Sequence, residues 1–193
     1  MNFFKTFKKE TIQIFEIDNL ILKPISKNDI EQIRIWRNEQ VSFLRQTNLI
    51  NSDEQISYFN DIVYPNFVLE EPKMILLSIF DKISTDLIGY GGFVHIDWKN
   101  KTSEVSFLCD TSFMNNPKIY KSCFLNFMKI IIEIAREELQ FKCLYSETFE
   151  FRKNHIKNLE SLGYTQFGIK KNAKLKNGIS YSSMLHQNKL SNV

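Results

Sequence analysis

The chain has 193 residues, of which 43% are hydrophobic, and its 25 basic and 22 acidic side chains give a net charge of +3. This length fits one domain with its own core, and so small a positive charge excludes a protein whose main ligand is nucleic acid. The 6 glycines and 4 prolines exclude a disordered or collagen-like chain, and because no apolar run could span a bilayer, we expect a cytoplasmic protein without a membrane span.

The N-terminal segment Met1–Lys9 alternates aromatic and basic residues and lacks the apolar region and cleavage site of a signal peptide. We expect residues 1–10 to form a flexible or locally packed arm, with a short amphipathic membrane arm as the alternative. Alternation of apolar and polar residues then predicts two strands, Thr11–Ile17 and Leu20–Ile25, around the turn-favouring pair Asp18-Asn19.

Two helices are predicted next. Ser26 is a suitable N-cap for a helix that runs to about Gln40. Ser52 begins a second helix through about Ile62, which Tyr64-Pro65-Asn66 should close because proline cannot continue a helix.

The period then changes to two, which predicts three antiparallel strands: Met74–Phe80, Leu87–Ile96 and Glu104–Cys109. The glycines of Gly89-Tyr-Gly-Gly92 stand in the middle of the second strand. Glycine weakens a strand unless the backbone bulges or another group approaches closely, so we expect one of these two arrangements there.

The C-terminal half is predicted as helix, strand, helix and hairpin: Asn116–Leu139, Cys143–Phe149, Lys153–Leu162, then Tyr164–Leu175 with Ile179–Gln187 around Asn177-Gly178. This order predicts a mixed α/β fold, with a mostly antiparallel central sheet and one parallel strand pair. A ligand cleft should open at the parallel junction. The three cysteines, Cys109, Cys123 and Cys143, have no metal-ligand spacing and are odd in number, so we expect free thiols.

Several strings in this order resemble the GNAT superfamily of acetyl-CoA-dependent N-acetyltransferases, over about Leu20 to Leu190. Four resemble its ribosomal-protein branch: Leu22-Lys-Pro-Ile25, Ile88-Gly-Tyr-Gly-Gly92, Ser103-Glu-Val-Ser-Phe107 and Asn158-Leu-Glu-Ser-Leu-Gly-Tyr164. Two are similar to members that act on nucleotide-linked amino sugars: Trp36-Arg-Asn38 and Val94-His-Ile-Asp-Trp98. The resemblance implies one GNAT domain over residues 1–193, a splayed parallel strand pair, acetyl-CoA as cosubstrate and no metal.

One departure concerns the loop where GNAT proteins normally carry R/Q-x-x-G-x-G/A, whose backbone N–H groups hold the cofactor pyrophosphate. The corresponding segment 113–122 contains no glycine and is about five residues longer. We expect the anion contacts to be Lys118, Lys121, the Ser122 hydroxyl and free N–H groups near Ile119 and Tyr120. The alternative is a loop that has lost cofactor binding.

The resemblance also implies that the strand ending near Cys109 offers backbone N–H groups to the thioester and pantetheine arm. The expected contacts are Phe107, Leu108 and Cys109, with Asn154 near the start of the last helix.

Acetyl transfer needs a base for the ammonium and an acid for the leaving thiolate. Period-two counting places Phe93, His95 and Asp97 on one strand face, and His95 is the leading base because the pKa of free histidine is about 6.5. Glu104 and Glu147 are alternative bases. His155 is the candidate acid, since the tyrosine usual in the superfamily has no counterpart near the last helix. The competing interpretation of His95 and Asp97 is a solvent-exposed sheet face, and that of His155 is a histidine on the helix surface.

The first two helices wall the acceptor side in the resembled fold. Candidate acceptor contacts are Trp36, Arg37, Arg45, Tyr58, Asp97 and Trp98, which could equally be surface arginines and core aromatics. Arginine forks bind diphosphates, so the leading acceptor is the primary amine of a nucleotide-linked amino sugar for surface polysaccharide synthesis. Alternatives are a protein N-terminus, a polyamine, or a non-catalytic interaction module, and a homodimer is a further expectation. The cluster Lys170, Lys171, Lys174 and Lys176 is interpreted as a solvated strand face.

Overall fold

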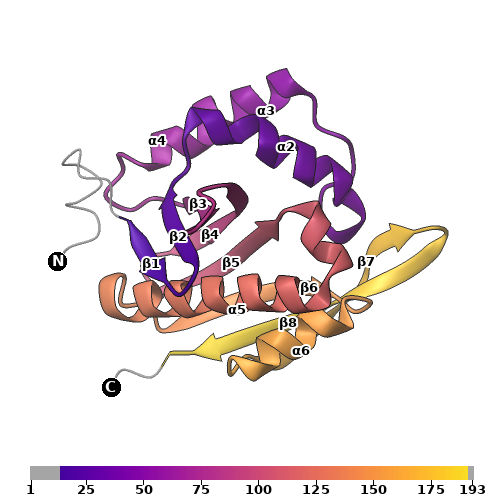
Figure 1. Cartoon of the computed structure of the whole chain (residues 1–193). Helices are drawn as coiled ribbons and strands as arrows, with labels where there is room; N and C mark the ends of the chain where they lie inside the picture. The colour runs from indigo at the N-terminus through magenta and orange to yellow at the C-terminus, as the bar shows by residue number, and fades with distance from the viewer. Residues whose placement is uncertain (1–13, 191–193) are drawn as a thin grey trace.

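An eight-stranded sheet forms the centre of the computed structural model, which describes residues 14–190 (Figure 1). The strand order is β1-β2-β3-β4-β5-β6-β8-β7. The strands are β1 (Phe15–Ile17), β2 (Leu20–Pro24), β3 (Ile75–Asp81), β4 (Leu87–Asp97), β5 (Thr102–Cys109), β6 (Cys143–Phe149), β7 (Thr165–Lys176) and β8 (Ile179–Lys189). All neighbours are antiparallel except β5 and β6, which confirms the predicted mixed sheet with one parallel pair. The predicted N-terminal arm, and the start of the first predicted strand, lie outside the described residues.

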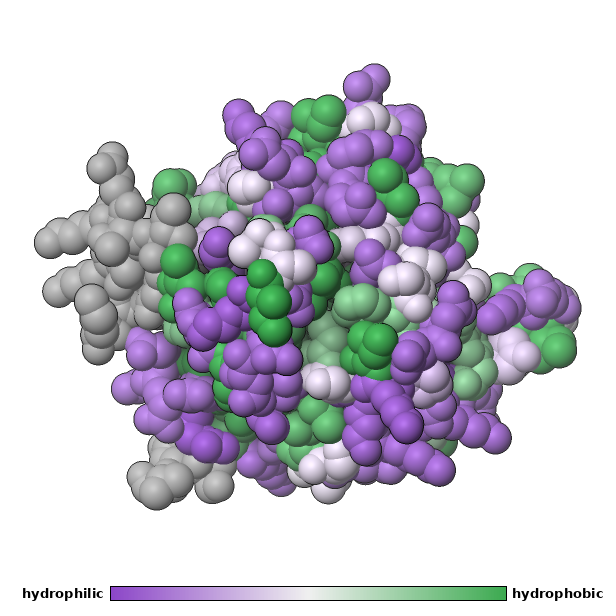
Figure 2. All heavy atoms as spheres, viewed as in Figure 1, coloured by the Kyte–Doolittle hydropathy of each residue, from purple (hydrophilic) through white to green (hydrophobic). Residues whose placement is uncertain are grey.

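Helices cover both faces of the sheet (Figure 1). On one face lie α2 (Ile30–Glu39), α3 (Ser52–Tyr58) and α4 (Tyr64–Asn66); on the other lie α5 (Pro117–Glu133) and α6 (Lys153–Ser161). Hydrophilic side chains dominate the helices in the view of Figure 2, and apolar ones gather between the α2–α3 layer and α5. None of the described helices combines the length and apolar character that crossing a bilayer requires.

The two faces have separate cores. Phe124, Phe127 and Ile131 of α5 pack with Leu77 and Phe93 of the sheet, and all five side chains are almost fully buried. These positions recur at three- and four-residue spacing along α5, so one apolar stripe of the helix faces the sheet. The core under α2 and α3 is smaller and is built around Ile33, Trp36, Phe59 and Leu76.

The second predicted helix continues past the residues that should close it. A π-helical turn over Phe59–Val63 connects α3 to α4, where Pro65 stands in the first turn. A proline is tolerated there because the N–H it lacks has no intrahelical partner in a first turn. The prediction that Tyr64-Pro65-Asn66 ends the helix is therefore wrong by about one turn.

Beyond Val94, strand β4 contains a bulge. The register against β5 shifts between Val94 and Asp97, and His95 has a positive φ of 51°. As a result Phe93 and Ile96 both lie in the α5-side core, and His95 is exposed. The prediction that Phe93, His95 and Asp97 share one face is wrong, because an extra residue reverses the alternation of side chains.

The parallel pair is short. Only Thr102, Ser103 and Glu104 of β5 pair with β6, at Cys143, Leu144 and Tyr145. Both strands continue for several residues without each other, so their backbones diverge and a cleft opens between them.

The loop after β5 uses its extra residues to build a short 3-10 helix, Thr111–Asn115. Asp110 caps this helix by accepting a hydrogen bond from Ser112 N at 2.7 Å. The buried Gln40 side chain donates to Cys109 O at 2.8 Å and to Thr111 Oγ1 at 3.1 Å, which ties the loop to the end of α2.

The glycines of β4 sit where other backbone and side chains approach closely, as predicted. A Cβ on Gly91 would lie 2.7 Å from Phe127 Cζ, and one on Gly92 would overlap Ile75 O. Gly92 also has φ +143°, which L-residues rarely adopt.

We therefore expect Gly92→Ala to lower the free energy of unfolding by about 2–4 kcal/mol, because the overlap adds to backbone strain. Gly168→Ala in β7 is the matched control. Its Cβ would lie 3.3 Å or more from its neighbours, so we expect a change within about 1 kcal/mol. Urea denaturation measures both, and equal effects would contradict this account of Gly92.

Candidate active site

Three connected cavities cross the molecule at the divergence of β5 and β6. The inner cleft, of about 100 Å³, lies between the two strands. The outer cavity, of about 710 Å³, lies between the start of α5 and α6, and the helix-side cavity, of about 630 Å³, lies under α3 and the α2–α3 connection. The inner cleft shares Phe43, Arg152 and His155 with the outer cavity, and Arg45 and Ser106 with the helix-side cavity. The shared lining residues show that the three cavities adjoin one another across the sheet.

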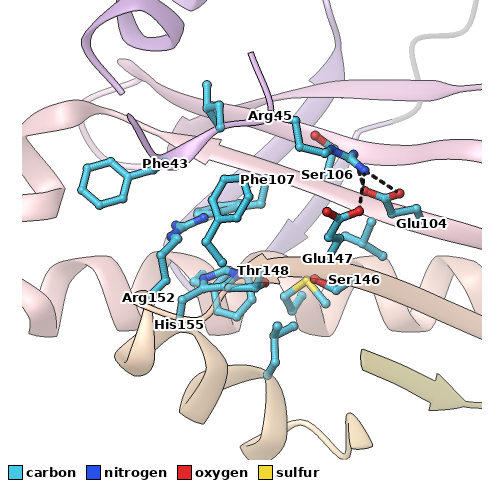
Figure 3. A pocket seen from close by; sticks show the side chains of 16 residues that line it. Phe43, Arg45, Glu104, Ser106, Phe107, Ser146, Glu147, Thr148, Arg152 and His155 are labelled. Carbon is cyan, nitrogen blue, oxygen red and sulfur yellow. Dashed lines mark hydrogen bonds and ion pairs between the residues drawn. The ribbon is translucent and has the colours of Figure 1, made fainter. Parts of the chain in front are cut away.

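Strand residues form the walls of the inner cleft (Figure 3). They are Glu104–Phe107 on one side and Ser146–Phe149 on the other. Phe124 and Met128 of α5 and Leu159 of α6 also line it. The cleft is thus narrow and lined by both apolar and polar side chains, with the carboxylates of Glu104 and Glu147 toward the helix-side cavity.

Glu104 and Glu147 are brought together by Arg45, which comes from the connection between α2 and α3 (Figure 3). Arg45 Nη2 lies 2.5 Å from Glu104 Oε1, and Arg45 Nη1 lies 3.4 Å from Glu147 Oε2. The Glu104 and Glu147 side chains are only 19% and 14% exposed, whereas that of Arg45 is 50% exposed. The site therefore holds two facing carboxylates at the junction of two cavities, with Arg45 between them and Lys170 Nζ 3.8 Å from Glu147 Oε1.

At the other end of the cleft, His155, Tyr120 and Arg152 form a hydrogen-bonded chain. Arg152 Nη2 donates to Tyr120 Oη at 2.9 Å, and Tyr120 Oη shares a hydrogen bond with His155 Nδ1 at 2.7 Å. Burial, together with the charge of Arg152, lowers the pKa of His155 well below its usual value. Burial also raises the pKa of Tyr120 to about 12. The imidazole is therefore neutral at neutral pH.

The outer cavity is strongly basic. None of its lining residues is an aspartate or glutamate, and five are cations: Lys118, Lys121, Arg152, Lys153 and Lys157. Tyr120 and Asn154 also line it. Such a lining suits a ligand with several phosphates.

The backbone at the start of α5 is less available than the sequence suggested. Lys118 N and Ile119 N both donate to Asn116 Oδ1, and Tyr120 N donates to Asn116 O. The N–H groups that we expected to be free therefore already have an acceptor, because the N-cap Asn116 accepts their hydrogen bonds. The exposed side chains of Ile119 and Ser122 line none of the three cavities.

Arg37 lies in the wall of the helix-side cavity. Its Nη1 donates to Tyr90 Oη at 2.7 Å and its Nε to Gln46 Oε1 at 3.1 Å. Within residues 14–190 no carboxylate pairs with this half-buried guanidinium. Tyr58 and the exposed His95 line the same cavity. An uncompensated arginine in a cavity of this size points to an anionic group on the ligand.

Three predicted acceptor contacts lie elsewhere. Trp36 is 2% exposed and packs in the core under α2, so it cannot meet a ligand. Asp97 accepts from Asn100 N and Nδ2 at 2.9 and 2.7 Å and closes its own turn. Trp98 donates to Pro72 O at 2.8 Å and packs on Phe141. These three predictions are wrong. A tryptophan can pack in a core and an aspartate can close a turn, and the sequence pattern does not distinguish these roles from ligand binding.

Of the predicted contacts on β5, only Phe107 lines the inner cleft. The Leu108 side chain faces the core under α2, and Cys109 is buried with its carbonyl bound to Gln40. All three cysteines are free, as predicted. Among the described residues no group of His, Cys, Asp and Glu side chains could hold a metal ion.

Several lining residues were not predicted. Phe43, Arg152, Lys153 and Lys157 all line the outer cavity. Lys153 and Lys157 are four residues apart and so lie on one face of α6, a spacing that is visible in the sequence. Phe43 gave no signal, because only the tertiary fold brings the α2–α3 connection to the cleft.

A model of the acetyltransferase (GNAT) domain matches residues 22–185 of this chain. The fold is similar to spermidine N-acetyltransferase from Vibrio cholerae in complex with CoA and spermine, with TM-score 0.77, 14% identity, and 90% of this chain and 97% of that chain covered. A dodecameric structure of the same enzyme matches with TM-score 0.73, 14% identity, and 90% and 95% covered.

A structure described as a phosphinothricin N-acetyltransferase matches with TM-score 0.71, 18% identity, and 89% and 99% covered. At these identities the likeness concerns the fold. A search of curated protein sequences finds no match.

Proposed function

Because the chain belongs to the GNAT family of acetyltransferases, we propose that it moves the acetyl group of acetyl-CoA to the primary amine of a small acceptor that also carries an anion. The supporting observation is that a basic outer cavity, a narrow cleft and a cavity with an uncompensated arginine adjoin one another in this order. The leading acceptor is a nucleotide-linked amino sugar.

Acetyl-CoA fits the outer cavity and the inner cleft by charge and by shape. Lys118, Lys121, Lys153 and Lys157 would hold its phosphates through side-chain charge. The pantetheine arm would enter the inner cleft, where β5 and β6 no longer pair with each other. When bound, acetyl-CoA supplies an activated acyl group; the chain supplies orientation and proton handling.

Glu104 is the proposed proton acceptor. It lines the inner cleft, whereas His95 lines only the helix-side cavity and is exposed at a bulge. A base must lie within hydrogen-bond reach of the reacting amine, directly or through one water. The acceptor ammonium would give its proton to Glu104, and the neutral amine would then attack the thioester carbon.

His155 is proposed to stabilise the departing thiolate. If Tyr120 donates to Nδ1, the neutral imidazole carries its proton on Nε2 and can donate it to the sulfur. The side chain lines both the inner cleft and the outer cavity, which is the passage the thiol end of CoA would occupy.

Arg37 is the proposed ligand of the acceptor's anion, since its charge has no carboxylate partner within residues 14–190. Arg45, expected to share this role, is instead paired with Glu104 and Glu147.

A polyamine is the second candidate, favoured by the fold likeness to spermidine N-acetyltransferase. The helix-side cavity is lined by Arg37 and Arg45 but only one acid, Glu54. Arg45 is already paired with Glu104 and Glu147, but Arg37 has no carboxylate partner within residues 14–190, and this unpaired charge favours an anionic acceptor over a polycation.

Acetyl-CoA binding should depend on salt and on the α5 lysines. We expect Lys118→Met with Lys121→Met to weaken acetyl-CoA binding about tenfold in calorimetry at low salt, because two charge–phosphate contacts are lost. Lys129→Met, on the exposed side of the same helix, should bind as wild type. Wild-type protein that gives no heat at millimolar acetyl-CoA would instead support an interaction module without cofactor.

Proton transfer can be assigned by two substitutions. Glu104→Gln should lower kcat about a hundredfold and leave acetyl-CoA affinity unchanged, because the base is lost and the cofactor cavity is not. His95→Gln should stay within about threefold of wild type. A hundredfold loss in His95→Gln with a near-normal Glu104→Gln would return the role of base to His95.

The acceptor class can be tested by thiol release against nucleotide-linked amino sugars, free amino sugars, polyamines and N-terminal peptides. Arg37→Met should raise KM at least tenfold for a nucleotide-linked amino sugar, because a charge-assisted hydrogen bond to phosphate is lost. For an uncharged amino sugar the change should stay within about twofold, and Arg37→Lys should be intermediate. Equal losses for both acceptors would make Arg37 structural.

A further inference from the structure

The ammonium of Lys174, in β7, is fully occupied by backbone carbonyls of one distant segment. Lys174 Nζ donates to Val41 O at 3.1 Å, Leu44 O at 2.7 Å and Gln46 O at 2.8 Å. A lysine ammonium has three N–H donors, so all three are used. The side chain is half-buried, and this burial lowers the pKa of Lys174. These contacts differ from the solvated strand face that the lysine cluster suggested.

The strand is shaped to deliver this side chain. The register of β7 against β8 shifts between Lys170 and Lys174, and Asn172 in between has a positive φ of 53°. A bulge of this kind bends a strand and re-aims its side chains. In Figure 1 the β7–β8 hairpin extends past the helices, beside the end of α2.

The segment that Lys174 holds, residues 41–46, carries groups of the active site; we call it the acceptor loop. Arg45 reaches from it to Glu104 and Glu147. The Gln46 side chain accepts from Arg37 Nε at 3.1 Å and donates to Asn38 Oδ1 at 3.1 Å. The Lys174 ammonium therefore holds the backbone on both sides of Arg45, which contacts the two carboxylates. It also holds the backbone of Gln46, whose side chain contacts Arg37.

The other contacts of the acceptor loop are made mostly by its side chains: Phe43 lies on Phe151, Leu44 packs on the core under α2, and Arg45 and Gln46 make the contacts given above. Its own backbone bonds are those of one 3-10 turn, with Phe43 N donating to Gln40 O and Leu44 N to Val41 O. Lys176 Nζ lies 4.8 Å from the centre of the Phe43 ring. Without Lys174, the Leu44 and Gln46 carbonyls would lose this partner and the Val41 carbonyl would keep only Leu44 N, which is costly unless the loop moves to water.

We propose that Lys174 is the positioning residue of the acceptor site: by binding the acceptor loop, it sets Arg37, through Gln46, and Arg45 at the distances that acceptor recognition requires. The proposal rests on the proposed function for its catalytic consequence. Its structural part does not depend on which amine is the substrate.

The first experiment measures hydrogen exchange in the full-length protein. In Lys174→Met the amides of residues 41–46 should exchange at least tenfold faster, while β3, β4 and α5 keep wild-type rates. Lys171→Met, an exposed lysine of the same strand, is the control and should exchange as wild type. Unchanged exchange at 41–46, or faster exchange across the whole sheet, would overturn the proposal.

The second experiment separates positioning from a general loss of stability. With the best acceptor of the panel, Lys174→Met should raise acceptor KM at least fivefold and change kcat less. The acetyl-CoA dissociation constant should stay within about twofold, since Phe43 is the one residue of the acceptor loop that lines the outer cavity and the lysines there lie on α5 and α6. Lys174→Arg, which keeps a cation, should recover part of the loss.

A fall in kcat without a change in acceptor KM would overturn the proposed role. If wild type acetylates no anionic amine, the proposed acceptor class fails, and the exchange experiment still decides whether Lys174 holds the loop.

Discussion

The divergence of β5 from β6 is the constraint on which the rest of the molecule depends. Two parallel strands that share only three paired residues leave backbone and side chains of both exposed to a common cleft. Helices α5 and α6 cover this gap on one face, and the α2–α3 connection crosses it on the other. The proposed base Glu104 lies on β5, and His155 and the lysines of the outer cavity lie on α5 and α6, so the site forms where the two strands stop pairing.

Charge is divided among the three adjoining cavities. The charged residues that line the outer cavity are all cations. The carboxylates Glu104 and Glu147 line the inner cleft, and Arg37 lines the helix-side cavity. This order allows a polyanion and an amine to approach from opposite sides without meeting the same charges, because each end attracts a different group. Lys174 and Gln46 extend the arrangement outward by fixing the segment that separates the two ends.

Regular elements could be predicted closely because periodicity is local: Cys143–Phe149 has the predicted bounds, and the three-stranded meander and the final hairpin are present. The bulge at His95 could not be predicted, since one extra residue reverses a strand without altering composition. The site was predicted in part. Glu104 and Glu147 were named separately, but their meeting over Arg45 joins residues far apart in sequence, and no local pattern reports such a contact.

The capping of α5 by Asn116 has a consequence for how this protein can change over time. A glycine-rich cradle holds a phosphate with main-chain groups, which nearly every substitution preserves. Here those groups are satisfied by Asn116, and the surrounding charge comes from side chains alone. Single replacements of lysine can then tune or abolish nucleotide affinity in small steps. Such a helix start can drift from tight binding to none without any change in fold.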